Sequence, residues 1–598
     1  MRSNIVILTD FSKVHHLFIT LLALLIVFTQ IGNSIAHAVE EDLAPEISTG
    51  FQQAQRSHFK QAIVVTAHPL ATQAGYNILQ QGGTAADAAI AVQAMLTLVE
   101  PQSSGIGGGA FMLYWNQKQQ KLQAFDGRET APLKADHQLF YKNGKPMPWI
   151  EALVGGRSVG SPGVLKMLEK AHKKNGHLPW NVLFSDAIEQ SNKGFVVSPR
   201  LHKLIASGIN PGLNLYPEAS AYFYLQDGSP LPIGFLRKNP ALAESLTLIS
   251  EQGADVFYSG SIGQAIVDTV RSATDNPGLL STEDLKSYSS IERKPICQPY
   301  QKYKVCGFPP PTSGGVTVLQ ILKLLEHQSI EQFDPSSADF NHLFTQASRL
   351  AFADRNRYLA DSDFVSVPTQ ALLNTEYLSN RAKLINQNLD IGKAKPGDPL
   401  NIAASLADDQ SPELPSTSHF VIVDQWGNAV SMTSSIEMAF GSTLMSGGFL
   451  LNNQLTDFSF KAVNNGRIIA NRVQPGKRPR SSMSPFMIFD QEGQLYAAVG
   501  SPGGSRIINY VAQSLLVMLN TDMSLQKAVN LPHISNRNGL TELEEGTPAS
   551  GLKTALEAKG HTVKVRDLNS GLHGFRRLPD GGWESGVDNR REGLALGN

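Results

Sequence analysis

The chain has 598 residues, 41 % of them hydrophobic, so it is long enough to bury a large core in one layered body or in several domains. Its 51 basic and 52 acidic residues give a formal net charge of −1 without a prominent basic tract. Nucleic acid is therefore excluded as an expected partner. The composition also excludes a disordered chain.

The first 38 residues have the pattern of a signal peptide. An apolar run, LFITLLALLIVF at residues 17–28, is followed by the small-x-small cleavage pattern Ala36-His37-Ala38. The run is shorter than the roughly 20 apolar residues that span a membrane, and no later run reaches that length. We expect cleavage after Ala38 and export to the periplasm or out of the cell. An uncleaved N-terminal anchor is the alternative.

Two helices are predicted in HPLATQAGYNILQQGGTAADAAIAVQAMLTLVEPQ, because the apolar residues recur at helical spacing. Gly82 and Gly83 end the first helix. Thr84 caps the second, and Asp87 follows three residues later, which is the spacing of a capping box. Pro101 ends this second helix.

The glycines of SSGIGGGAFMLYW come directly before a predicted strand. A dinucleotide-binding loop would need the spacing G-x-G-x-x-G ahead of a helix, and this pattern fails at Ala110. We expect instead that the backbone here approaches another element closely, since glycine has no side chain to prevent it. A hairpin follows, with Arg128 just beyond its second strand.

Residues 150–400 are predicted to be mainly helical, since GVTVLQILKLLEH and FNHLFTQASRLAFADRNRYLAD have apolar residues at helical spacing. Within this stretch, Cys297 and Cys306 flank a strand-like segment, YQKYKV. An oxidising compartment permits a disulfide between them, and two free buried cysteines are the alternative. Without a histidine pair nearby, the two cysteines do not predict a zinc site.

The segment at about residues 392–416 is rich in Pro, Ser, Asp and Ala, and it predicts an exposed linker of the kind where chains are cut. Beyond it the apolar period becomes two. HFVIVDQWGNAVSMTSS predicts a hairpin that turns at residues 424–428, and PFMIFDQEGQLYAAVGSPGG predicts another. The helix SRIINYVAQSLLVML follows. Strands on both sides of the helical stretch indicate an α+β fold with sheets inside and helices outside.

The sequence contains no Walker loop, HExxH, G-x-S-x-G or C-x-x-C motif. A Ser-His-Asp triad remains open, because its members need not be close in sequence. Ser416, Thr417 and Ser418 stand between the linker and a strand. They form either an ordinary polar loop or a nucleophile that chain cleavage exposes. A new N-terminal residue would carry its own base, since an α-amino group has a pKa of roughly 7.7–8.0.

Ordered motifs along nearly the whole chain after the leader resemble those of the γ-glutamyltranspeptidases, which are N-terminal-nucleophile hydrolases. They are GTAADAAIA, PQSSGIGGGAFML, DGRETAP and PPPTSGG, then TSH, DQWGNAVSMT, AFGS, LLNNQLTDFS, PGKRPRSSMSP and GSPGGSRI. The resemblance implies a four-layer αββα sandwich built from two chains of one autocleaved precursor. The large chain would span residues 39–416, and the small catalytic chain would span residues 417–598.

The same resemblance implies a role for each matching residue. Thr417 would be the nucleophile, with cleavage between Ser416 and Thr417, because register with His419 favours Thr417 over its neighbours. Ser435 would be a supporting hydroxyl, and Gly503 and Gly504 would be oxyanion donors. The donor's α-carboxylate would be bound by Arg128, Ser481 and Ser482. Its α-ammonium would be bound by Gln454 and Asp457. No metal or organic cofactor is implied.

Two departures from the family pattern concern the donor. Glu437 occupies a position where characterised transpeptidases often have Asn, and its carboxylate would still face an α-ammonium. The segment SFKAVNNGRIIANRVQPGKRP is shorter than the lid of some relatives and lacks the usual lid Tyr. We expect γ-glutamyl donors such as glutathione, with water, amino acids or dipeptides as acceptors. The alternatives are a glutaryl or cephalosporin-type acylase of the same fold and a non-catalytic exported binding protein.

Overall fold

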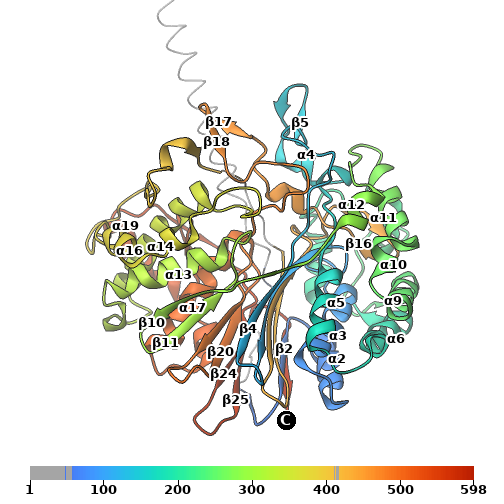
Figure 1. Ribbon diagram of the computed structural model, residues 1–598, viewed down its shortest axis with the longest axis horizontal. Helices are drawn as coiled ribbons and strands as arrows, with labels where there is room; N and C mark the ends of the chain where they lie inside the picture. The colour runs from blue at the N-terminus through green and yellow to red at the C-terminus, as the bar shows by residue number, and fades with distance from the viewer. Residues whose placement is uncertain (1–47, 49–56, 410, 412–415) are drawn as a thin grey trace, which may run out of the picture. The chain divides into compact units, whose positions relative to one another are not determined.

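Two seven-stranded sheets form the centre of the structure (Figure 1). The computed structural model describes Ser48, residues 57–409, Ser411 and residues 416–598. The predicted signal peptide, with its cleavage site at Ala38, lies outside these residues. Within them, no helix is both long enough and apolar enough to cross a membrane.

The first sheet contains the strand that directly follows Thr417. In spatial order it comprises β26 (Leu594–Gly597), β2 (Ile63–Thr66), β13 (Ser418–Val423), β14 (Ala429–Ser435), β3 (Gly109–Asn116), β4 (Lys121–Gly127) and β9 (Ile291–Arg293). The predicted hairpin of β13 and β14 is confirmed. It turns where Asp424 accepts hydrogen bonds from the backbone N–H groups of Trp426 and Asn428.

The second sheet contains the other predicted hairpin, which is also confirmed. In spatial order it comprises β1 (His58–Phe59), β25 (Trp583–Val587), β24 (His573–Arg577), β20 (Leu495–Gly500), β19 (Phe486–Phe489), β11 (Tyr303–Gly307) and β10 (Ile296–Tyr300). Both sheets therefore combine strands from before and after Thr417.

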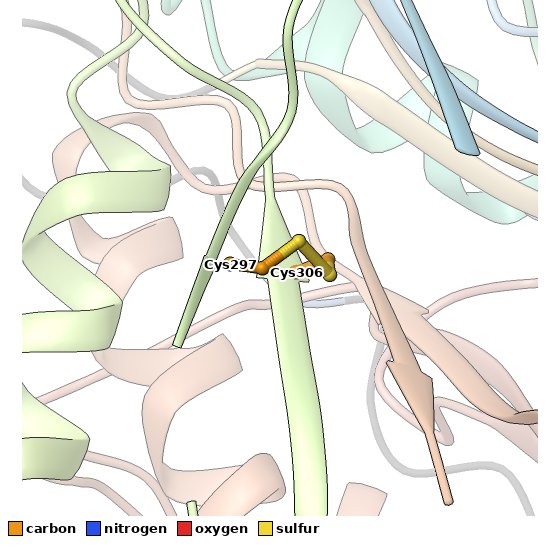
Figure 2. Close-up of a disulfide and its surroundings, with 2 residues drawn as sticks. All are labelled: Cys297 and Cys306. Carbon is orange, nitrogen blue, oxygen red and sulfur yellow. A yellow bond between two sulfur atoms is a disulfide. The ribbon is translucent and has the colours of Figure 1, made fainter. Parts of the chain in front are cut away.

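A disulfide joins Cys297 to Cys306 across strands β10 and β11 (Figure 2). The two cysteines are directly opposite each other in the register, and their Cα atoms are 4.1 Å apart. The single strand predicted for YQKYKV is therefore wrong, because the segment is a hairpin that turns after Tyr300. The turn residues, Gln301 and Lys302, are not among the types that mark turns in a sequence.

Helices cover the outer face of each sheet (Figure 1). The first sheet contacts α2 (Pro69–Gln80), α3 (Ala85–Val99) and α5 (Val164–Asn175), while the second contacts α13 (Gly314–Glu326), α17 (Ile507–Asn520) and α18 (Leu525–Val529). A longer helix, α14 (Ala338–Tyr358), packs on α13. The inner faces of the sheets contact each other through β2, β13 and β14 on one side and β20, β24 and β25 on the other.

Side-chain alternation lets β13 contribute to the two largest hydrophobic clusters of the protein. Phe420 and Ile422 pack in the cluster that includes α2, α3 and α5. Val421 and Val423 point the other way, into the cluster that the two sheets share with α13 and α17. All four side chains are buried, so the strand that follows Thr417 is fixed in the middle of the protein.

The predicted helical character of the middle of the chain is confirmed. Its remaining helices are α4 (Trp149–Leu153), α6 (Ser185–Lys193), α7 (Pro199–Ala206), α8 (Pro217–Phe223), α9 (Pro240–Gln252), α10 (Asp255–Tyr258), α11 (Ser261–Arg271), α12 (Thr282–Ser287), α15 (Thr369–Leu372) and α16 (Thr375–Ala382). The capping box of α3 is also confirmed. Thr84 accepts from the Asp87 backbone N–H, and the Asp87 carboxylate accepts from the Thr84 N–H at 2.8 Å.

The close approach predicted for the glycine motif is confirmed. A Cβ atom on Gly107 would lie 2.1 Å from the Leu450 carbonyl oxygen, and one on Gly108 would lie 2.2 Å from the Ser435 carbonyl oxygen. Either substitution would force backbone apart, since real Cβ contacts are not this short. Glycine is therefore needed at both positions, and Gly108 packs directly against the end of β14.

The expected exposed linker is wrong in part. Strand β12 (Leu406–Ala407) pairs in parallel with β18 (Arg467–Ile469), and Ala407, Asp409 and Ser416 are buried. Composition shows that a segment is polar, but it does not show the distant residues that pair with it. Residues 410 and 412–415 lie outside the part of the chain that the structure describes.

Candidate active site

Thr417 lies directly before β13, and its side chain touches the peptide bond that joins it to Ser416. The Oγ1 hydroxyl donates to the Ser416 carbonyl oxygen at 2.5 Å and to Ser435 Oγ at 3.3 Å. Thr417 is 3 % exposed. The hydroxyl predicted as the nucleophile is therefore in contact with the carbonyl group that it would attack in an intramolecular cleavage.

Further hydrogen bonds hold both sides of this peptide bond. Ser416 Oγ donates to the Gln102 carbonyl oxygen at 2.7 Å, and Ser435 Oγ donates to the Ser416 carbonyl oxygen at 2.8 Å. Arg591 Nη1 donates to the Thr417 carbonyl oxygen at 3.0 Å. The Ser435 hydroxyl polarises the Ser416 carbonyl, and the same hydrogen bond would stabilise negative charge on that oxygen.

A small cavity lies beside Thr417. It is lined by Thr417, Ser435, Glu437, Gln454, Asp457, Ser481, Ser482 and Gly504, together with Met483 and Ile507. Most of the residues predicted for the site therefore meet in one place, although they come from separate strands, turns and loops. Ser416 is adjacent through its hydrogen bonds, and Gly503 is adjacent in the chain.

Arg128 joins the site through Asp457 rather than by lining the cavity. Its fully buried guanidinium donates to the Asp457 carboxylate, to the Pro479 carbonyl oxygen at 3.1 Å and to the Arg480 carbonyl oxygen at 2.9 Å. Burial alone would lower the pKa of Arg128, but the acidic groups around it, Asp457 foremost, outweigh this effect and raise the pKa. Arg128 therefore remains a cation that supports the wall of the cavity.

Glu129 is a buried carboxyl group beside this cation, and it is not among the residues predicted for the site. Its Oε2 lies 3.5 Å from Arg128 Nη1. Burial raises the pKa of Glu129 to about 8, and the nearby Arg128 only partly offsets that effect. Burial therefore favours the neutral form of Glu129, and Asp457 is the acidic group that is hydrogen-bonded to Arg128.

Three oxygen-bearing side chains cluster on one side of the cavity. Gln454 Nε2 donates to Glu437 Oε2 at 3.1 Å and to Asp457 Oδ2 at 3.5 Å. Glu437 has a positive φ of 79°, which is uncommon for a residue with a side chain, and its backbone N–H donates to Ser435 Oγ at 2.8 Å. The cluster offers acceptors to a cationic group, as the sequence analysis expected.

The serine pair is held by residues that precede Thr417 in the chain. Ser313 Oγ donates to the Ser481 carbonyl oxygen at 2.6 Å, and Arg355 Nη2 donates to Ser482 Oγ at 2.7 Å. Ser313 belongs to the PPPTSGG motif, so that motif serves to support the loop of Ser481 and Ser482. A cation next to Ser482 also suits the binding of a carboxylate.

Gly503 and Gly504 adopt backbone conformations that favour glycine, with φ values of 136° and 59°. A Cβ atom on Gly503 would lie 2.7 Å from the Tyr510 ring. The pair leads into a short 3-10 turn, η6 (Gly504–Arg506), and then into α17. Gly504 lines the cavity beside Thr417, whereas Gly503 is adjacent to it in the chain.

Sequence reasoning missed Arg591, Arg355 and the carbonyl oxygen of Gln102. Arg355 lies in a segment whose helical spacing was recognised, but spacing does not show which distant residue a side chain reaches. Gln102 acts through its backbone, so its residue type carries no signal. Arg591 lies in NRREG near the C-terminus, where nothing in the sequence connects it to Thr417.

A Ser-His-Asp group does exist, but it is sealed inside the protein. Ser570 Oγ donates to Asp588, and His533 Nε2 lies 2.6 Å from Ser570 Oγ. All three residues are at most 1 % exposed, so a substrate does not reach Ser570. This arrangement fits a structural network rather than a hydrolytic triad.

His419 is also a buried residue without a place in the cavity. Its Nδ1 lies 2.8 Å from Thr433 Oγ1, and burial together with His573 holds the pKa of His419 well below its ordinary value. His419 is therefore not placed to act as a base for Thr417. Among the described residues, no group of three or more His, Cys, Asp or Glu side chains is placed to hold a metal ion.

Comparison with known proteins gives consistent matches over most of the chain. The family model described as gamma-glutamyltranspeptidase matches residues 71–598. The glutathione hydrolase proenzyme of Bacillus subtilis (strain 168) is 36 % identical over 591 residues, which cover 97 % of this chain and 98 % of that protein. The acylase ACY 1 proenzyme of Pseudomonas sp. (strain SE83) is 34 % identical over 528 residues, which cover 87 % and 90 %.

The fold is shared with a solved acylase. The crystal structure of cephalosporin acylase from Bacillus halodurans matches with a TM-score of 0.81 at 26 % identity, covering 92 % of this chain and 97 % of that one. This α+β fold, the family match and the identities above agree with the motifs that meet at Thr417. The chain is therefore an enzyme of the gamma-glutamyltranspeptidase family.

Proposed function

We propose that the protein cuts its own chain before Thr417 and then uses Thr417 to hydrolyse or transfer γ-glutamyl groups. The observation that carries the proposal is the 2.5 Å contact between Thr417 Oγ1 and the Ser416 carbonyl oxygen, beside a cavity lined by carboxylates and hydroxyls. The name of the Bacillus subtilis relative, a glutathione hydrolase proenzyme, supports both parts of the proposal.

In the cleavage step, Thr417 Oγ1 attacks the Ser416 carbonyl carbon, and the hydroxyl proton goes to the departing Thr417 nitrogen. The C–N bond breaks, and an ester forms between Ser416 and the Thr417 side chain. The Ser435 hydroxyl stabilises the charge on the Ser416 oxygen. Water then hydrolyses the ester, which leaves a carboxylate on Ser416 and a free α-amino group on Thr417. The large chain would span residues 39–416 and the small chain residues 417–598.

In the catalytic step, the new α-amino group accepts the Thr417 hydroxyl proton, and Oγ1 attacks the γ-carbonyl carbon of the donor. The N–H groups of Gly503 and Gly504 would stabilise the oxyanion. The C–N bond of the donor breaks, the departing amine takes the proton, and an acyl-enzyme remains. Water completes hydrolysis, whereas the amine of an amino acid or dipeptide completes transfer.

Donor recognition follows from the charges around the cavity. Ser481 and Ser482 would hold the α-carboxylate, while the buried cation of Arg128 behind the cavity wall and Arg355 beside Ser482 add positive charge on this side. The oxygens of Glu437, Gln454 and Asp457 would hold the α-ammonium. Glutathione presents both groups at the end of its γ-glutamyl arm, and it is therefore the proposed donor.

A glutaryl or cephalosporin-type acylase is the second candidate, because the similarity to ACY 1 and to cephalosporin acylase covers most of the chain. The short lid segment forms a hairpin, β17 (Val463–Asn464) and β18, whose Val463 and Ile468 side chains are exposed. A shorter lid would leave the donor site more open, and a more open site would admit larger acyl groups. A non-catalytic binding protein is not favoured, since the nucleophile and its supporting hydroxyl are in contact.

The experiment compares γ-glutamyl and glutaryl anilides as donors for the wild type, Thr417→Ala, Thr417→Ser and Ser418→Ala. We expect the wild type to prefer the γ-glutamyl donor. Thr417→Ala should stay uncut and inactive, while Thr417→Ser should cut slowly and retain some activity. Ser418→Ala serves as the matched control and should behave as the wild type. A folded Thr417→Ala that still splits before residue 417 or hydrolyses the anilide would refute the role of Thr417.

Three further features belong to this proposal. The packing of helices on the outer face of each sheet supports the four-layer αββα sandwich of N-terminal-nucleophile hydrolases. The leader pattern ending at Ala38 supports export to the periplasm or the medium. The disulfide of Cys297 and Cys306 also suits such an oxidising compartment. The chemistry uses side chains and backbone groups of this chain, without a cofactor.

A further inference from the structure

A closed ring of five buried residues connects the donor site with the segment that precedes Thr417. Asp409 Oδ2 pairs with Arg480 Nη2 at 3.0 Å, and the Arg480 carbonyl oxygen accepts from Arg128 at 2.9 Å. Arg128 pairs with the Asp457 carboxylate. Asn471 Nδ2 closes the ring, because it donates at 2.7 Å both to the Asp457 carbonyl oxygen and to Asp409 Oδ2.

The ring is buried and pairs opposite charges. Its members are at most 4 % exposed. Arg128 is paired with Asp457, and Arg480 is paired with Asp409. Removing one charge from such a buried set leaves the opposite charge without compensation, which is costly in a site that excludes water.

Asp409 holds more than one part of the donor site. Through Arg480 it fixes the loop that continues into Ser481, since the Arg480 backbone N–H also donates to Asn471 Oδ1 at 2.9 Å. Through Asn471 it fixes the backbone of Asp457. The two walls of the cavity that would bind the α-carboxylate and the α-ammonium are thus tied to a single carboxylate.

We propose that Asp409 is a positioning residue for donor binding, contributed by the end of the large chain to a site that lies mostly on the small chain. The proposal rests on the proposed function, because it assumes that the cavity binds a γ-glutamyl donor. Asp409 lies before the expected cleavage point, so cutting the chain leaves it attached to the large chain. Its buried partners would then keep it in place in the mature enzyme.

The test measures kcat and KM for a γ-glutamyl anilide with the wild type, Asp409→Asn and Asp408→Asn. Asp408 is the matched control, since its side chain is 47 % exposed and pairs with Arg357 Nε at 2.6 Å. We expect Asp409→Asn to raise KM roughly tenfold with kcat changed by less than about twofold, because the ring touches donor-binding groups rather than the reacting atoms. Asp408→Asn should match the wild type.

A second variant, Arg480→Gln, removes the cation from the other side of the pair and retains the backbone N–H and carbonyl of residue 480. It should raise KM to a similar extent. In the double variant, Asp409→Asn with Arg480→Gln, KM should be no higher than in the more affected single variant. If Asp409→Asn does not fold, the result with Arg480→Gln decides. Unchanged KM in the folded variants would overturn the inference.

The outcomes also separate this inference from the proposed function. A wild type that does not act on γ-glutamyl donors would overturn the proposed function and this inference with it. An active wild type whose Asp409→Asn form has a normal KM would overturn only the inference. Variants that fold but remain uncut, while Asp408→Asn is cut normally, would also overturn it, because Asp409 would then act in maturation rather than in donor binding.

Discussion

At the scale of single residues, the contacts of Ser435 best distinguish a reactive peptide bond before Thr417 from an ordinary polar loop that leads into a strand. Its hydroxyl donates to the Ser416 carbonyl oxygen at 2.8 Å and lies 3.3 Å from Thr417 Oγ1. Ser435→Ala should slow self-cleavage by roughly 10²–10³-fold, which is the usual effect of losing one oxyanion donor. Time courses of chain cleavage on denaturing gels would measure this rate.

Two controls accompany that measurement. Ser435→Thr keeps the hydroxyl and should cleave at a rate close to the wild type. Ser434→Ala removes a buried hydroxyl from the neighbouring position of β14, opposite Ser418 in the register, and should have no effect on cleavage. Cleavage of Ser435→Ala at the wild-type rate would show that the hydrogen bond to Ser416 does not stabilise the reacting carbonyl.

Glu437 is the residue that should distinguish γ-glutamyl from glutaryl donors. It lines the cavity and accepts from Gln454 at 3.1 Å, so its carboxylate is placed to bind an α-ammonium. Glu437→Gln should lower kcat/KM for a γ-glutamyl anilide roughly tenfold or more, since hydrogen bonds to charged groups contribute about 1.5–3 kcal/mol. A glutaryl anilide lacks the ammonium and should be nearly unaffected. Equal losses with both donors would contradict an ammonium contact.

At the scale of elements, the sequence correctly predicts those structures that depend only on residues close together in the chain. The capping box of α3 and the hairpin of β13 and β14 form as predicted, because caps and tight turns are specified within a few residues. The prediction of one strand at residues 300–305 is wrong, because Gln301 and Lys302 form the turn between β10 and β11 although they are not typical turn residues.

Contacts between distant segments had no comparable signal. The buried position of Asp409 and the pairing of β12 with β18 depend on residues far along the chain, and a polar composition suggested exposure instead. The candidate site could be listed residue by residue only because several motifs resembled a known family. Arg355 and Arg591, which lie outside the residues assigned from those motifs, were recognised only from their contacts in the structure.

The cap of α3 gives a prediction at this scale. Thr84→Ala removes the capping hydroxyl and should cost about 1 kcal/mol of stability. In a protein of this size that loss should lower the melting temperature by roughly 1–2 °C, because the unfolding entropy grows with chain length. Thr84→Ser retains the cap and should melt close to the wild type. Identical melting of the Ala and Ser variants would show that the cap contributes nothing measurable.

At the scale of the whole molecule, the two expected chains are interleaved. In the first sheet, β13 and β14 lie between β2 and β3, and in the second sheet β19 pairs with β11. The hydrogen bonds between these strands do not depend on the peptide bond between Ser416 and Thr417. Cleavage should therefore leave the sheets intact, with Thr417 still fixed at the start of β13.

Mass spectrometry of the purified protein, first under native and then under denaturing conditions, tests the central claim most directly. The account predicts a single native complex that separates on denaturation into two chains, the smaller of which begins at Thr417. The large chain should end at Ser416. A single uncut polypeptide, or a small chain that begins at any other residue, would contradict the assignment of Thr417 as the nucleophile that this protein releases by its own cleavage.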